Sequence, residues 1–120
     1  MKSDRPVRAI SIRQPYVEEI LRGKKKYEFR STRTNIRGRV WIYAGMKPAP
    51  KEDWIHIDKK PGELPTGVIV GTVEIVTCRP TTRKNEADFT YVLNAPKRLR
   101  VPKRVSNQPQ PRFWRPKFRN

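Results

Sequence analysis

Residues 67–78 form the most apolar stretch of this chain, and their composition is that of a β-strand. Most of the apolar positions carry β-branched side chains, which favour extended backbone; these positions are Val68, Ile69, Val70, Val73, Ile75 and Val76. Glu74 is the only acidic residue in this run. The segment is the strongest strand signal in the sequence, so we expect a fold built mainly on β-structure.

Shorter segments on both sides of this stretch also have strand patterns. Apolar residues alternate or cluster in four of them, which are residues 7–12, 26–30, 39–44 and 89–93. One helix is expected between Pro15 and Gly23, where apolar residues recur at helical spacing. Short strands, one short helix and many turns predict a small, partly open β-barrel with helices at its openings. The expected class is mainly β with short helices (α+β).

The expected core takes apolar residues from each of these elements except residues 89–93. Its members are Ile10, Ile12, Ile20, Leu21, Phe29, Val40, Ile42, Ile69, Val73 and Ile75. Residues 45–66 contain four prolines and few periodic apolar positions, so a long surface loop is expected there.

Residues 97–120 form a basic, proline-rich C-terminal segment with nine Lys or Arg residues and no acid. Its prolines exclude a long helix and favour extended or irregular backbone. Phe113 and Trp114 are apolar enough that we expect them to dock on the barrel as an edge strand. Because 120 residues lie within the range of one domain, residues 1–120 are expected to form a single domain.

The charge of the chain predicts a polyanionic partner. Lys and Arg number 28 against 11 Asp and Glu, a formal net charge of +17 at pH 7. Self-repulsion on this scale destabilises a compact domain unless something compensates for it. Nucleic acid is the favoured partner, because each cation placed on a phosphate releases a condensed counterion. An anionic membrane or a ribosomal surface remains the alternative.

Cysteine and histidine are too scarce for most metal and catalytic sites. Cys78 is the only cysteine and His56 the only histidine, so neither a disulfide nor a His/Cys zinc site is expected. We expect no cofactor and no metal. No stretch approaches the roughly 20 apolar residues that span a bilayer. The lone cysteine, and a start without a basic segment leading into an apolar run, predict an intracellular, cytoplasmic protein.

Residues 23–30 concentrate a glycine, three lysines, a glutamate and an arginine where the expected helix meets a strand. Glycine allows close backbone approach, lysine is a point charge for phosphate, and arginine offers a planar fork for phosphate or a base edge. Period-two alternation puts Glu28 and Arg30 on one face of that strand. The alternative is a solvated basic strand in which Glu28 pairs with a neighbour.

The order of several motifs resembles a known family. Residues 11–16 read Ser-Ile-Arg-Gln-Pro-Tyr, and Gly23, Lys25, Glu28 and Arg30 then fill a G-x-K-x-x-E-x-R pattern; further similar segments lie at residues 37–44, 67–74, 91–96 and 113–114. From about residue 9 to residue 114 the chain resembles the ASCH domain family of the PUA-like superfamily. The resemblance implies a PUA-like barrel whose cleft beside the G-x-K-x-x-E-x-R segment accepts nucleic acid. Single-stranded RNA or a modified base is the expected ligand, with single-stranded DNA as the alternative and a monomer as the favoured state.

Relatives of this family leave catalysis open. Some are amidohydrolases that act on N4-acetylcytidine with a lysine, a threonine three positions on, and a glutamate. Lys25 and Glu74 are plausible equivalents of the first and third, but Glu28 stands where the threonine would be. Other relatives are associated with RNA cleavage, so a metal-independent ribonuclease is a second alternative, and its candidate acid and base are Lys25, Tyr16, Glu28 or His56. A basic partner-binding module of a ribonucleoprotein assembly is a third.

The expected nucleic-acid-binding residues combine cations with hydrogen-bonding and aromatic groups; they are Arg13, Gln14, Tyr16, Lys24, Lys25, Lys26, Glu28, Arg30, Arg33 and Trp54. For Gln14 the alternative is that its amide caps backbone at the end of the strand. For Trp54 the alternative to a stacking platform is a small satellite core. Lys25→Ala and Arg30→Ala are expected to weaken RNA binding and to leave stability nearly unchanged.

Overall fold

The strands of this protein form one curled, six-stranded sheet. The structure, a computed structural model, describes residues 5–119. Its strands are β1 (Ala9–Ile12), β2 (Tyr27–Arg30), β3 (Gly38–Ala44), β4 (Val68–Pro80), β5 (Phe89–Lys103) and β6 (Phe113–Trp114). Two short helices complete the fold, α1 (Tyr16–Leu21) and the 3-10 helix η1 (Lys51–Trp54). None of the helices in the described part of the chain has the length and apolar character needed to cross a membrane.

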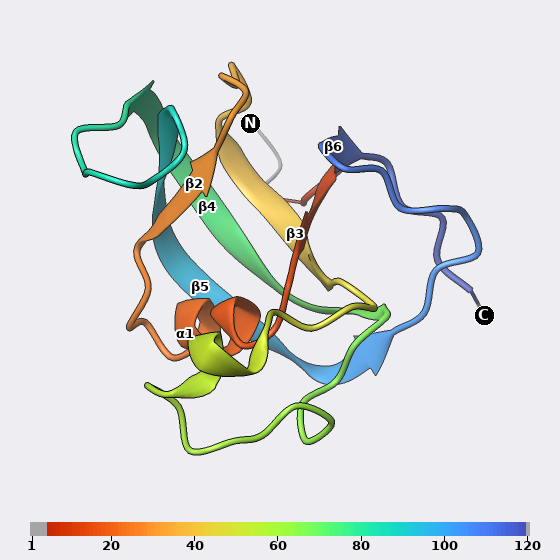
Figure 1. The fold of residues 1–120 in the computed structure, drawn as a ribbon. Helices are drawn as coiled ribbons and strands as arrows, with labels where there is room; N and C mark the ends of the chain where they lie inside the picture. Colours follow the sequence, from red (N-terminus) through yellow and green to blue (C-terminus); the bar gives the residue numbers. More distant parts are fainter. Residues whose placement is uncertain (1–4, 120) are drawn as a thin grey trace.

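The order of the strands explains the shape of the sheet. The order is β2-β5-β4-β3-β1-β6, so β4 lies near the centre and β2 and β6 form the edges. Neighbouring strands are antiparallel except for β1 and β3, which run parallel. The sheet curls into a half-barrel, with α1 and η1 near one end (Figure 1). The predicted mainly β fold, a partly open barrel with helices at an opening, is confirmed.

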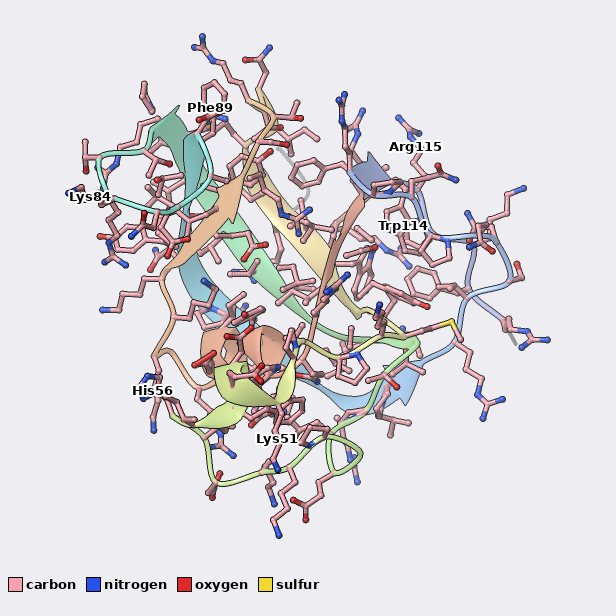
Figure 2. All side chains as sticks on the ribbon, in the orientation of Figure 1. Lys51, His56, Lys84, Phe89, Trp114 and Arg115 are labelled. Carbon is pink, nitrogen blue, oxygen red and sulfur yellow. The ribbon has the colours of Figure 1, made fainter. Side chains whose placement is uncertain are left out.

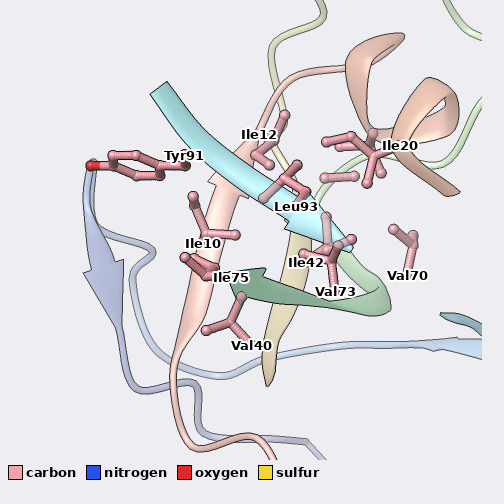
Figure 3. Packing of buried hydrophobic residues seen from close by; sticks show 12 residues of the cluster. Ile10, Ile12, Ile20, Val40, Ile42, Val70, Val73, Ile75, Tyr91 and Leu93 are labelled. Atoms are coloured by element: carbon pink, nitrogen blue, oxygen red, sulfur yellow. The ribbon is translucent and has the colours of Figure 1, made fainter. Parts of the chain in front are cut away.

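The inner face of the sheet holds the main hydrophobic core. β-branched side chains from β1, β3 and β4 meet there with Leu93 of β5 and Ile20 of α1 (Figure 3). All the residues that we expected in the core are buried except Leu21 and Phe29, which are half-buried. Phe29 is less buried because it lies on the opposite face of β2 from Glu28 and lines a surface hollow.

A smaller apolar cluster covers the outer face of the same sheet. Its buried members are Ala9, Tyr43, Ile69 and Trp114. β6 pairs with β1, and the indole N–H of Trp114 donates to the hydroxyl of Ser11 at 3.0 Å. The expectation that Phe113 and Trp114 form an edge strand is therefore confirmed.

β5 is longer than the sequence pattern indicated. The strand expected at residues 89–93 continues to Lys103 and includes residues predicted to be extended or irregular. Register shifts against β4 absorb its irregular positions, among them Ala95, which has a φ of 48°. Such bulges explain how Pro96 can stand inside a strand, because a proline lacks the N–H that a regular ladder needs. The long partner strand β4 supplies the pairing that the local sequence does not reveal.

Candidate functional site

Gly23 ends α1 and lets the chain turn back toward the sheet. Its φ of 75° lies in the left-handed region, which glycine adopts without strain. The N–H of Gly23 donates to the carbonyl of Ile20 at 2.9 Å, which closes the helix. Lys25 follows in the short connection to β2. The turn thus places the lysine beside the first residues of that strand.

Glu28 forms ion pairs with Lys25 and Arg30. Its side chain is 11% exposed, and its carboxylate accepts a hydrogen bond of 2.8 Å from Nε of Arg30. The Nζ atom of Lys25 lies 3.9 Å from the other carboxylate oxygen. A buried carboxylate is costly unless it is paired, so the two cations stabilise the position of Glu28. The structure brings Lys25, Glu28 and Arg30 together.

Arg30 is held by backbone as well as by Glu28. One terminal nitrogen donates to the carbonyl of Ser11 at 2.6 Å, and the other donates to the carbonyl of Pro111 at 3.2 Å. The guanidinium therefore links β2 to β1 and to the chain just before β6. All three nitrogens of the guanidinium are engaged, which fixes its plane, and one N–H on each terminal nitrogen is left for a ligand.

Lys25 lies between two aromatic rings. Its Nζ atom is 5.4 Å from the ring centroid of Tyr16 and 5.3 Å from that of Phe29. Both distances lie within the range in which an ammonium is attracted to a ring face. The rings and Glu28 thus orient an ammonium group whose side chain is 21% exposed.

Tyr16 is fixed through its hydroxyl. The phenol donates a hydrogen bond of 2.6 Å to the carboxylate of Asp53 in η1. Burial raises the pKa of Tyr16 well above its ordinary value, and the hydrogen bond and negative charge of Asp53 raise it further. The phenol therefore stays protonated at neutral pH and acts as a donor and a ring surface, not as a base.

These residues line two adjoining hollows, which we call the cleft. The larger has a volume of about 540 Å³ and is lined by Tyr16, Glu19, Lys24, Lys25, Lys26, Tyr27, Glu28, Phe29, Arg83 and Glu86. The smaller, of about 250 Å³, is lined by Ser11, Ile12, Arg13, Tyr16, Glu28 and Arg30. Both share Tyr16 and Glu28. The cleft therefore runs from the β4–β5 hairpin, past Lys25, to Arg30.

The sequence patterns did not indicate Arg83, which covers one side of the larger hollow. Its guanidinium carbon lies 5.4 Å from the ring centroid of Tyr27 and 5.5 Å from that of Phe29. It belongs to the β4–β5 hairpin, which carries Lys84 at the side of the molecule away from β6 (Figure 2). The pairing of β2 with β5 places this hairpin next to β2. Its basic residues were the only signal in the sequence, and they resemble those of many surface loops.

Comparison with known proteins identifies the family of this chain. A model of the ASCH domain matches residues 10–98, which include the lining residues of both hollows. The chain belongs to the ASCH domain family. Activating signal cointegrator 1 from Mus musculus and its counterpart from Homo sapiens are each 25% identical to this ASCH domain over 127 residues. The match covers 88% of the chain but only 22% of each relative, so the chain spans about a fifth of their length.

Two predicted site residues, Gln14 and Trp54, are buried in the ASCH domain and do not line the cleft. Gln14 is 1% exposed; its amide N–H donates to the carbonyl of Pro65 at 3.0 Å and its oxygen accepts from the N–H of Glu18 at 3.1 Å. Its amide thus satisfies backbone groups, as in the alternative considered for it. Trp54 is 6% exposed and donates to the carbonyl of Ala49 at 3.0 Å. Its burial provides packing in the 45–66 segment and leaves no ring face for stacking.

Two further predicted residues lie outside the cleft. Glu74 alternates on β4 with Val73 and Ile75, which point into the core, so its side chain lies on the opposite face of the sheet. Lys25 instead lines a small hollow with Val73. The lysine and the later glutamate of the amidohydrolase pattern are therefore not brought together. Arg33 lies beyond β2 and lines a different hollow. Within residues 5–119, no group of three or more His, Cys, Asp or Glu side chains is placed to hold a metal ion.

Proposed function

We propose that this ASCH domain binds single-stranded RNA and accepts one base, ordinary or modified, in the cleft. The observation that carries the proposal is the position of Lys25, an oriented and partly exposed ammonium beside two aromatic rings and a buried carboxylate. The volume of the larger hollow falls within the range of about 300–1,000 Å³ that is typical of small-ligand sites.

The groups of the cleft match the chemistry of a nucleotide. The ammonium of Lys25 can contact a phosphate or a base oxygen, and the carboxylate of Glu28 can accept from a base amino group. Aromatic rings at Tyr16, Tyr27 and Phe29 offer stacking surfaces, which contribute about 1–3 kcal/mol for each base. A net charge of +17 favours a polynucleotide over a free nucleoside as the ligand, because a nucleoside carries no phosphate that the positive charge could attract.

Replacement of Lys25 tests this proposal directly. Lys25→Ala should weaken binding of a single-stranded RNA of about 10 nucleotides by about 1–3 kcal/mol, because it removes a charge-assisted contact. The measurement is fluorescence anisotropy with labelled RNA, alongside DNA of the same sequence. Lys60→Ala is the matched control, because Lys60 is exposed in the 45–66 segment and lines neither hollow of the cleft.

The two variants separate a site from general charge. Equal affinities for Lys25→Ala and Lys60→Ala would show that the cleft contributes no more than any surface lysine, and the proposal would fail. Equal affinity of the wild-type chain for RNA and DNA would retain the cleft but remove the preference for RNA.

A further inference from the structure

A second hollow lies on the open side of the half-barrel, between the edge strands β2 and β6. It has a volume of about 470 Å³ and includes residues from β1, from β2 and the chain after it, from β5 and from β6. Four arginines line it, namely Arg8, Arg30, Arg33 and Arg112. We call this hollow the seam pocket. No family motif or charge run in the sequence groups these residues, which become neighbours only when the sheet curls.

The wall and floor of the seam pocket are held in place. The rings of Tyr91 and Phe113 stack with their centroids 6.1 Å apart and their planes at 19°. Tyr91 lies at the rim of the core (Figure 3), and its hydroxyl donates to the carbonyl of Thr32. The hydroxyl oxygen of Thr34 accepts from the N–H of Ile36 at 3.1 Å. The segment after β2 is thereby tied to an aromatic floor.

The seam pocket has a strong excess of positive charge. None of its lining residues is acidic, and of its four arginines Arg30 forms an ion pair, with the carboxylate of Glu28. The side chains of Arg8, Arg33 and Arg112 are exposed, and no hydrogen bond or ion pair of theirs is seen among residues 5–119. Three guanidinium groups therefore surround one hollow with their donors available. A planar guanidinium can form two parallel hydrogen bonds to a phosphate.

The seam pocket is continuous with the cleft through Arg30. This residue lines both the smaller hollow of the cleft and the seam pocket. A strand that leaves the cleft past Arg30 would thus reach the three free arginines. The floor is not a stacking platform, because Tyr91 is 4% exposed. Phosphate groups, which need donors at the rim, fit the pocket better than a base does.

We infer that the seam pocket binds backbone phosphates of the same single-stranded nucleic acid whose base enters the cleft. This inference rests on the proposed function and adds a second contact region to it. Arg8 and Arg112 lie outside the part of the chain that the ASCH model matches. Two of the four arginines of the seam pocket are therefore supplied by segments outside the matched part, and Arg30 and Arg33 lie inside it.

The test is the double variant Arg33→Gln/Arg112→Gln in the full chain, with RNA affinity measured over a range of salt concentrations. Loss of two phosphate contacts should weaken binding by roughly 10-fold or more at low salt. The log-log salt slope should become shallower by about 0.7 for each arginine, or about 1.4 for the pair. Arg100→Gln is the control, since Arg100 is exposed on β5 and lines neither the cleft nor the seam pocket.

Lys25→Ala is measured in parallel, so that the two sites can fail separately. If Lys25→Ala weakens binding while the double variant keeps the affinity and salt slope of the wild type, the seam-pocket inference is overturned and the proposed function stands. If the double variant loses affinity and Lys25→Ala does not, the cleft fails as the base site. An equal loss per arginine in Arg100→Gln would overturn the seam pocket as a specific site. Circular dichroism and thermal melting confirm that each variant is folded.

Discussion

At the scale of single residues, Arg30 has a structural role in addition to the place beside Glu28 that the sequence predicted. Their alternation on β2 predicted a shared face, and the 2.8 Å hydrogen bond between them agrees with it. The structure adds that Arg30 also donates to two backbone carbonyls, one of them on a residue 81 positions away in the sequence. Arg30 is therefore a structural tie as well as a wall of the cleft. The ammonium of Lys25 donates to no backbone carbonyl among the contacts of residues 5–119, so Lys25 is the cleaner probe of binding.

Arg30→Ala should consequently destabilise the protein, contrary to the expectation from sequence that its stability would barely change. We expect the free energy of unfolding to fall by about 1–3 kcal/mol, because the substitution leaves Glu28 with less compensation and two carbonyls without their donor. Urea unfolding followed by circular dichroism measures the change. Arg33→Ala, at an exposed position, should stay within about 0.5 kcal/mol of the wild type. If Arg30→Ala and Arg33→Ala had the same free energy of unfolding, the hydrogen bonds of Arg30 would contribute nothing measurable to stability.

At the scale of elements, α1 depends on tertiary contacts for its stability and position. Six residues are too few for an independently stable helix. Glu18 anchors it to β5 through two hydrogen bonds of 2.8 Å from Arg98, and Arg22 donates to the same carboxylate at 2.7 Å. The helix also lies close to β4, since a Cβ added at Gly71 would come within 2.7 Å of Leu21. The position of α1 in turn sets the position of Tyr16 and Lys25.

Glu18→Gln should lower the free energy of unfolding by about 1–3 kcal/mol at neutral pH, because it removes the charge that accepts hydrogen bonds from Arg98 and Arg22. The loss is limited because Arg98 is half exposed, so solvent screens part of the interaction. Burial by itself raises the pKa of Glu18, but the hydrogen bonds from Arg98 and Arg22 outweigh it and hold the pKa below its ordinary value. A lowered carboxyl pKa means that this stabilisation is present at neutral pH and is lost as the carboxylate is protonated.

The stability difference between wild type and Glu18→Gln should therefore shrink as the pH falls below about 4. Chemical unfolding at a series of pH values measures this difference. Glu52→Gln serves as a control, because Glu52 is exposed and no contact of its side chain is seen in the described part of the chain. A difference that stayed constant down to acid pH would mean that ionised Glu18 contributes nothing to stability.

At the scale of the whole molecule, the basic C-terminal segment is part of the barrel and not a separable tail. Trp114 is 5% exposed, and β6 completes the edge of the sheet beside β1. Arg115 lies next to Trp114 at this edge but is exposed (Figure 2). Deletion of the segment would remove apolar packing together with its charge. The contribution of the charge is therefore better measured by neutral substitutions.

The combined variant Arg115→Gln/Lys117→Gln/Arg119→Gln should fold like the wild type, because all three positions are exposed. If roughly six phosphates contact the wild-type protein, its log-log salt slope for RNA is about −4. The triple variant should then have a slope shallower by about 2, as measured by anisotropy at several salt concentrations. A wild-type slope in the folded variant would assign the phosphate contacts to the cleft and seam pocket alone.

Features that depend on local pattern could be predicted from the sequence alone. Period-two and helical spacings located the strands and α1, β-branched composition identified the core, and the turn at Gly23 with the alternation of β2 grouped Lys25, Glu28 and Arg30. Tertiary structure decided everything that depends on residues distant in the chain. The long pairing of β4 with β5 extended a strand through prolines, and packing buried Gln14 and Trp54, whose polar groups found backbone partners. Pairing of β2 with β5 placed Arg83 over the cleft, and curling of the sheet gathered the seam pocket. A local pattern specifies which face a side chain occupies but not which distant segment comes to lie against it.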